Sequence, residues 1–150
     1  MEREQAIKFM LDLLKLMRQK SASDLFITVG FPPAMKIDGK VTPVSKQDLT
    51  PQNCKALTYA IMNDKQLKEF EATKECNFAV SPPGIGRYRA NAFIQQNNPG
   101  LVMRTIAAEI PNIDDLGLPE VLKDVVMTKN GLVIMVGGTG SGKSTSLAAM

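Results

Sequence analysis

Residues 132–145 read LVIMVGGTGSGKST, an apolar run that passes directly into a glycine-rich segment. The apolar run has no alternation, which is typical of a strand in a parallel sheet covered on both faces. Gly137, Gly142, Lys143 and Ser144 then match the G-x-x-x-x-G-K-[ST] phosphate-loop pattern at every specified position. The order of strand, loop and helix predicts nucleotide binding, whereas the alternative is a glycine-rich turn without a ligand.

The phosphate-loop pattern predicts a role for each of its residues. Glycines let successive backbone N–H groups point toward phosphate oxygens, and the N-terminus of the following helix adds a favourable dipole. Lys143 is expected to reach the β- and γ-phosphates of ATP, and Ser144 is expected to bind Mg²⁺. Thr145 is expected to begin the helix. Lys143 is also the predicted catalytic residue of the loop. The predicted nucleotide-binding residues are Gly137, Gly138, Thr139, Gly140, Ser141, Gly142, Lys143, Ser144 and Thr145.

The sequence after the loop is short. It ends at Met150, about two helical turns beyond Lys143 at 3.6 residues per turn. A single strand cannot form the sheet that a phosphate-loop domain needs. We therefore interpret residues 132–150 as the start of a truncated α/β ATPase domain and expect little activity from this chain alone.

Composition limits the other possibilities. A chain of 150 residues with 44% hydrophobic and 22% charged residues can form about one globular domain. Its net charge of +3 is too small to favour nucleic-acid binding. Cys54 and Cys76 lack a C-x-x-C arrangement, which favours free thiols in a reducing cytoplasm. The absence of histidine excludes histidine-based triads and histidine-ligated zinc from these residues.

Residues 1–108 are predicted to form an α+β domain, with a mostly antiparallel sheet flanked by helices. Charged residues interrupt the first helix, so it is not a transmembrane or targeting segment. Its broad apolar surface favours packing inside the domain, with a contact to another subunit or to a membrane surface as the alternative. The expected elements are helices over 1–20, from Thr50 and after Asn63, strands 25–29, 77–80, 87–94 and 101–106, and a hairpin at 35–41. Residues 109–131 are expected to form a connector with two short helical pieces.

Three arginines are predicted to share one face of this sheet. Arg87 and Arg89 are two residues apart on one expected strand, so their side chains point the same way. If residues 97–100 form a four-residue hairpin loop, Phe93 pairs with Arg104, and Arg104 joins the same face. These arginines are either a solvated or internally paired basic surface, or a site for an anion.

Several segments resemble the type IV pilus retraction ATPases, and the resemblance covers the whole chain. It rests on Ala22-Ser-Asp-Leu, the Gly-x-Pro-Pro at 30–33, Ile-Met-Asn-Asp-Lys-Gln at 61–66, Arg-Tyr-Arg-Ala-Asn-Ala-Phe at 87–93 and residues 140–150. Residues 75–78, 84–87 and 138–139 are more similar to the accessory, PilU-like branch of that family.

The resemblance implies a cytoplasmic homohexameric motor that uses ATP and Mg²⁺ for pilus retraction and twitching motility. It implies a PAS-like domain at 1–108, a linker with the first helix of the motor domain at 109–131, and a RecA-like ATPase domain beginning at 132. It also implies contacts with a paralogous retraction ATPase and with the pilus platform protein at the inner membrane. Arg89 and Arg104 would act in trans on a neighbouring subunit's nucleotide. The acidic and histidine boxes of the family lie outside the given residues.

Two other classes of function remain open. An ABC-type transport ATPase, or less readily a small-molecule kinase or GTPase, uses a similar phosphate loop, usually after a shorter preceding segment. Residues 1–108 could instead form a regulatory or protein-interaction module, and a fold alone does not assign such a module a ligand.

Overall fold

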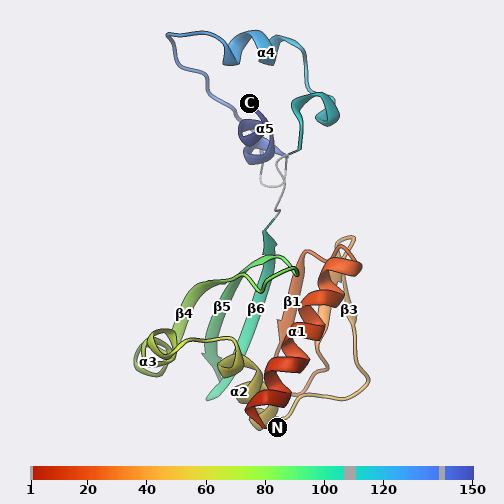
Figure 1. The fold of residues 1–150 in the computed structure, drawn as a ribbon, viewed down its shortest axis with the longest axis vertical. Helices are drawn as coiled ribbons and strands as arrows, with labels where there is room; N and C mark the ends of the chain where they lie inside the picture. Colours follow the sequence, from red (N-terminus) through yellow and green to blue (C-terminus); the bar gives the residue numbers. More distant parts are fainter. Residues whose placement is uncertain (1, 107–110, 139–140) are drawn as a thin grey trace. The chain divides into compact units, whose positions relative to one another are not determined.

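The computed structural model of the chain describes residues 2–106, 111–138 and 141–150 (Figure 1). These residues form two compact units, Met1–Ile106 and Ala107–Met150, and each unit is described by itself. Ala108, the predicted end of the first domain, lies outside the described residues.

The first unit is built on a six-stranded sheet with the order β3-β2-β1-β6-β5-β4, in which every pair of neighbours is antiparallel. The predicted α+β class with an antiparallel sheet is therefore confirmed. Its elements are α1 (Arg3–Gln19), β1 (Asp24–Ile27), β2 (Ala34–Ile37), β3 (Lys40–Pro43), α2 (Pro51–Ala60), α3 (Asp64–Thr73), β4 (Glu75–Val80), β5 (Arg87–Gln95) and β6 (Asn98–Ile106).

One face of the sheet forms the core with α1 and α2 (Figure 1). Strand pairing aligns apolar residues in a row across five strands, because cross-strand partners point to the same face. The Tyr88 hydroxyl on β5 donates a buried hydrogen bond of 2.9 Å to the Leu14 carbonyl on α1. The row consists of Met35, Leu25, Met103, Ala90 and Phe78, all buried.

Local sequence signals determine several of the element ends. Asp38 and Gly39 have positive φ angles of 48° and 78° and close the hairpin of β2 and β3 as predicted. Thr50 caps α2 by accepting a hydrogen bond from the Asn53 N–H at 3.2 Å. Asn63 forms a reciprocal capping box with Gln66 at the start of α3.

The hairpin between β5 and β6 differs from the prediction. Gln95 pairs with Asn98, so the loop has only Gln96 and Asn97, with φ angles of 49° and 60°, instead of residues 97–100. Two positive φ angles are typical of the type I′ turn that suits a two-residue hairpin. Pro99 fits inside β6 because it pairs with Ile94, whose N–H points away from β6 to the Lys74 carbonyl. The missing N–H of Pro99 therefore leaves no gap in this ladder.

In residues 111–138 and 141–150, the second unit contains the 3-10 helix η1 (Ile113–Leu116) and the α-helices α4 (Val121–Val126) and α5 (Lys143–Ala149). The two short helical pieces expected in the connector are thus present as η1 and α4. Among the described residues, no helix is both long enough and apolar enough to span a membrane.

The prediction of a buried strand at residues 132–136 is wrong for this structure. Residues 131–138 form neither strand nor helix, and the side chains of Leu132, Ile134 and Val136 are 83%, 73% and 90% exposed. A strand needs a neighbour that takes up its N–H and C=O groups, and the only sheet among the described residues contains the six strands of the first unit. The apolar sequence therefore has the composition of a strand, but it has no neighbouring strand among the described residues with which to form a sheet.

Candidate functional site

The phosphate-loop segment lies in the second unit and leads into α5. Gly142 is the N-cap with a φ of 87°, a conformation that glycine adopts without strain. Since the Ser146 N–H donates to the Gly142 carbonyl at 2.9 Å, the helix begins at Lys143. Thr145 is therefore inside the helix, two residues after its start, and not its first residue as predicted.

Lys143 contacts the loop's own carbonyl groups. Its Nζ donates hydrogen bonds of 2.6 Å to the carbonyl oxygens of both Gly137 and Gly138. The Ser141 hydroxyl donates to the same Gly138 carbonyl at 2.8 Å. The ammonium group of Lys143 is thus occupied by two carbonyl oxygens from the start of the loop, and nucleotide binding would require Lys143 to exchange them for phosphate oxygens.

A side chain at Gly137 would require the Ser141 side chain to move. A Cβ atom added at Gly137 would lie 2.8 Å from the Ser141 hydroxyl oxygen. Ser144 and Thr145 are exposed on the first turn of α5, so the Ser144 hydroxyl is accessible to a metal ion. Thr139 and Gly140, two further predicted nucleotide-binding residues, lie outside the described residues.

The predicted arginine face is present in the first unit. Arg89 and Arg104 are direct cross-strand partners on β5 and β6, and both side chains are exposed. The prediction paired Arg104 with Phe93 instead, but the shift of four residues preserves the alternation of faces. Arg87 shares this face and pairs with Ile106 near the end of the ladder.

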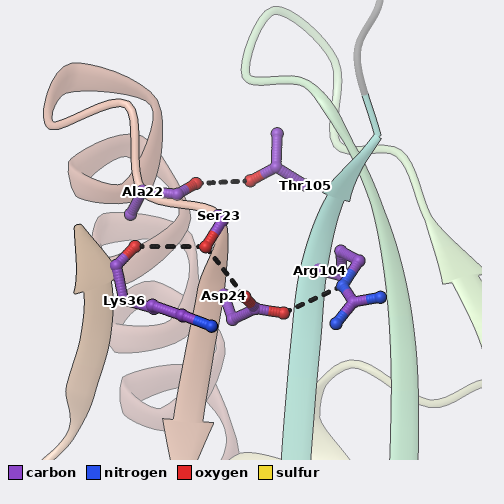
Figure 2. A network of polar contacts seen from close by, with 6 residues as sticks. All are labelled: Ala22, Ser23, Asp24, Lys36, Arg104 and Thr105. Carbon is purple, nitrogen blue, oxygen red and sulfur yellow. Dashed lines mark hydrogen bonds and ion pairs between the residues drawn. The ribbon is translucent and has the colours of Figure 1, made fainter. Parts of the chain in front are cut away.

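The pairing places Lys36, Asp24, Arg104 and Arg89 in one row across four strands, which we call the charged row. Figure 2 shows Asp24 between Lys36 and Arg104. Arg104 Nε donates to Asp24 Oδ1 at 2.9 Å, and the Ser23 hydroxyl donates to Asp24 Oδ2 at 2.8 Å. The sequence interpretation missed Asp24 and Ser23, although both belong to the Ala22-Ser-Asp-Leu run that carried the family resemblance.

The environment of Asp24 favours its ionised form. Asp24 is only 5% exposed, and burial alone would raise its pKa. Hydrogen bonds from Ser23 and Arg104, with the positive charges of Arg104 and Lys36, outweigh this effect and hold the pKa of Asp24 below its usual value of 3.8. Asp24 is therefore a carboxylate at neutral pH.

A hollow of about 370 Å³ opens beside the charged row. Arg89 and Arg104 line it together with Asn91, whose amide donates to Asn77 Oδ1 at 3.0 Å. The Asn91 amide also donates to Glu75 Oε1 at 3.1 Å, so its donors are occupied. Two guanidinium groups and one carboxylate line the hollow itself, which gives it an excess of positive charge suited to an anion. The full set of lining residues is Asp24, Asn77, Arg89, Asn91, Val102 and Arg104.

The lowered pKa gives a prediction for stability. Changing Asp24 to Asn should destabilise the 150-residue chain at pH 7, because the ionised carboxylate contributes stability above its unfolded-state pKa. That contribution is lost as the pH falls through the lower pKa of the folded state. The difference in free energy of unfolding between the parent and Asp24→Asn should thus be constant from pH 7 to 5 and shrink below about pH 4. Urea denaturation across this pH range measures it, and a difference that grows on acidification would contradict the assignment.

Comparisons with known proteins agree with the fold and with the sequence motif. No family model matches the chain. The type IV pilus ATPase PilU of Pseudomonas aeruginosa is 53% identical over 138 residues, which are 92% of this chain and 36% of PilU. The retraction ATPase PilT of the same organism is 44% identical over 139 residues, which are 93% of this chain and 40% of PilT.

Solved structures give the same relationship. A crystal structure of the pilus retraction motor PilT with bound ADP matches 93% of this chain at 37% identity, with a TM-score of 0.83. The chain spans about two fifths of that protein.

The sequence identity and the shared fold define the chain as a relative of pilus ATPases. More specifically, it is a homologue of the type IV pilus ATPases PilU and PilT, and its identity to PilU is the higher of the two. The family resemblance predicted from the sequence is confirmed.

Proposed function

We propose that the full-length protein containing this chain is a P-loop ATPase motor that powers type IV pilus retraction and twitching motility. The observation that carries this proposal is the 53% identity to PilU across 92% of the chain. The chain spans 36% of PilU and 40% of PilT, so the activity of the whole protein is inferred from these relatives.

In the proposed motor, residues 1–108 form a PAS-like domain, residues 109–131 form the linker and first helix, and residues 132–150 begin a RecA-like ATPase domain. Lys143 pairs with the β- and γ-phosphates, and Ser144 binds Mg²⁺ with the nucleotide. The loop from Gly137 to Thr145 surrounds the phosphates. The accessible Ser144 hydroxyl and the tight approach of Ser141 to Gly137 are compatible with these roles.

The proposed assembly is a cytoplasmic homohexamer that works with a paralogous retraction ATPase at the platform protein of the inner membrane. In a ring of this kind, the active site lies between subunits. Arg89 and Arg104 of one subunit then supply positive charge to the nucleotide of its neighbour. Excess positive charge in the hollow of the first unit supports this role.

A purified full-length protein tests the proposal. It should hydrolyse ATP in a Mg²⁺-dependent manner, and its mass by light scattering should be six times that of one subunit. Loss of the gene should abolish or impair twitching. Stoichiometric small-ligand binding without ATP hydrolysis would instead favour a regulatory module.

The 150-residue chain alone is expected to bind ATP only weakly. Lys143 already donates to the Gly137 and Gly138 carbonyls, and residues 131–138 lack regular structure. Ordering such a segment costs about 1–2 kcal/mol per residue, which offsets the gain from phosphate contacts. Calorimetric titration of the chain with Mg-ATP should give no micromolar affinity and no turnover. The Lys143→Ala chain provides the baseline heat, and a micromolar dissociation constant that depends on Lys143 would refute the expectation.

A further inference from the structure

Only the Nε nitrogen of the Arg104 guanidinium group is paired within the described residues. Its Nε donates to Asp24 Oδ1 at 2.9 Å, while the side chain remains 74% exposed. Neither Nη nitrogen of Arg104 donates a hydrogen bond to any residue in the described part of the chain. The contact therefore fixes the direction of the guanidinium group and leaves its two outer nitrogens available.

Asp24 is itself held firmly. Its side chain is 7% exposed, and its second oxygen accepts the Ser23 hydroxyl at 2.8 Å. The backbone just before Asp24 is tied to β6, because the Thr105 N–H donates to the Ser23 carbonyl at 3.0 Å. The Thr105 hydroxyl also donates to the Ala22 carbonyl at 2.9 Å (Figure 2). A buried carboxylate with both oxygens bonded is a rigid support for a long and otherwise mobile side chain.

The charged row leaves Arg89 without a carboxylate of its own. Arg89 lies directly opposite Arg104, and like charges in this position repel one another. Asp24 is on the far side of Arg104 from Arg89 in the row, so it compensates one guanidinium group and not both. An anion that enters the hollow can contact Arg89 and the outer nitrogens of Arg104 together, with the Asp24 contact still in place.

We propose that Asp24 is a positioning residue, which orients Arg104 toward the phosphate groups of a nucleotide, and that Ser23 supports it. This inference rests on the proposed role of Arg104 in ATP hydrolysis. Asp24 does not touch the nucleotide; it acts by restricting the Arg104 side chain. Displacement of a group by about 1 Å can reduce a rate by as much as 10²-fold, so loss of this restraint should be visible in kcat.

A double-mutant cycle in the full-length protein tests the proposal. Asp24→Asn retains the shape of the side chain and removes its charge. It should lower kcat about tenfold or more in the parent background, with KM for ATP changed much less. In the Arg104→Ala background, the same change should have no further effect on kcat, because the group that Asp24 positions is gone. Single-turnover assays measure the slow Arg104→Ala rates.

Two further variants give the cycle a second test and a control. Ser23→Ala keeps the Asp24 carboxylate and removes one of its donors, so it should lower kcat in the same direction by a smaller factor, again only when Arg104 is present. It also replaces Asp24→Asn if that variant does not fold. Lys36→Met removes the other charged neighbour of Asp24 in the row and should leave kcat within about twofold of the parent, because Asp24 keeps its hydrogen bonds to Ser23 and Arg104 and Lys36 lies two strands away from Arg104.

The possible outcomes distinguish the positioning role of Asp24 from the catalytic role of Arg104. If Asp24→Asn lowers kcat equally with and without Arg104, the residue has a general structural role and the proposal is wrong. If Arg104→Ala is slow and both Asp24→Asn and Ser23→Ala retain the parent kcat, Arg104 keeps its role and Asp24 loses the one proposed. If Arg104→Ala itself hydrolyses ATP at the parent rate, the proposed function of Arg104 fails, and the role of Asp24 fails with it.

Discussion

Changing Lys143 to alanine in the full-length protein is expected to reduce ATP hydrolysis to background. Lys143 is the cation of the phosphate loop, and in the proposed site it stabilises the charge that develops on the transferred phosphoryl group. Removal of a single group that stabilises transition-state charge costs roughly 10² to 10³ in rate. A lysine that also binds the ground-state phosphates should cost at least as much. Steady-state ATPase assays at saturating Mg-ATP measure the loss.

The design of this experiment must separate chemistry from assembly. Light scattering should give the same oligomeric state for Lys143→Ala as for the parent if the ring depends on the first unit and the linker. Lys123→Ala is a matched control, since it removes a lysine of the second unit that pairs with Asp114, and no hydrogen bond joins this lysine to the part of the loop that the structure describes. It should hydrolyse ATP normally. Parent-level turnover by an assembled Lys143→Ala protein would overturn the role given to this residue.

Local signals made much of the first unit predictable from sequence. The turn at Asp38-Gly39, the cap at Thr50 and the alternation of residues 87–94 each act over a few residues, so they determine structure wherever they occur. The first helix was likewise expected from its apolar spacing. The spacing alone does not say which part of that broad apolar surface is buried. Leu13 is buried while Ile7 is 36% exposed, because packing against the sheet and α2 sets the rotation of the helix.

Pairing between distant segments was harder to predict from the sequence. The exact register of β5 and β6 depends on a turn formed by Gln96 and Asn97, neither of which is a glycine. The contact between Asp24 and Arg104 joins residues 80 positions apart and follows from the pairing of β1 with β6. The apolar run at 132–136 illustrates the opposite error: its composition favours a strand, but a strand also needs a partner, which composition does not supply.

The arrangement of Arg89 and Arg104 differs from what a merely solvated basic surface would need. A surface of that kind can spread its charges, whereas here Arg89 and Arg104 are adjacent partners and share a hollow with the Asn91 amide. Arg104 is also partly paired, as the alternative interpretation expected, since Asp24 takes its Nε. Pairing and anion binding are compatible because they use different nitrogens of one guanidinium group.

Arg89→Ala and Arg104→Ala, each made singly in the full-length protein, should lower kcat well beyond tenfold while the first unit remains folded. An arginine supplied to a phosphoryl-transfer site can be worth roughly 10³ to 10⁵ in rate. Arg87→Ala is the matched control on the same strand and face, and it should have the smallest effect of the three. Thermal melts on each variant identify any loss of activity that arises from unfolding.

Mixing inactive subunits distinguishes action in trans from action within one subunit. In a ring formed from Lys143→Ala and Arg104→Ala subunits, some interfaces join an intact loop from one subunit to an intact arginine from its neighbour. Such mixtures should regain part of the parent ATPase rate, and they should exceed the slow rate of Arg104→Ala and the background rate of Lys143→Ala measured separately. If Arg104 served its own subunit's nucleotide, every site would lack one of the two groups and mixing would restore nothing. Parent-level turnover by unmixed Arg89→Ala and Arg104→Ala proteins would refute the proposed role of both arginines in ATP hydrolysis.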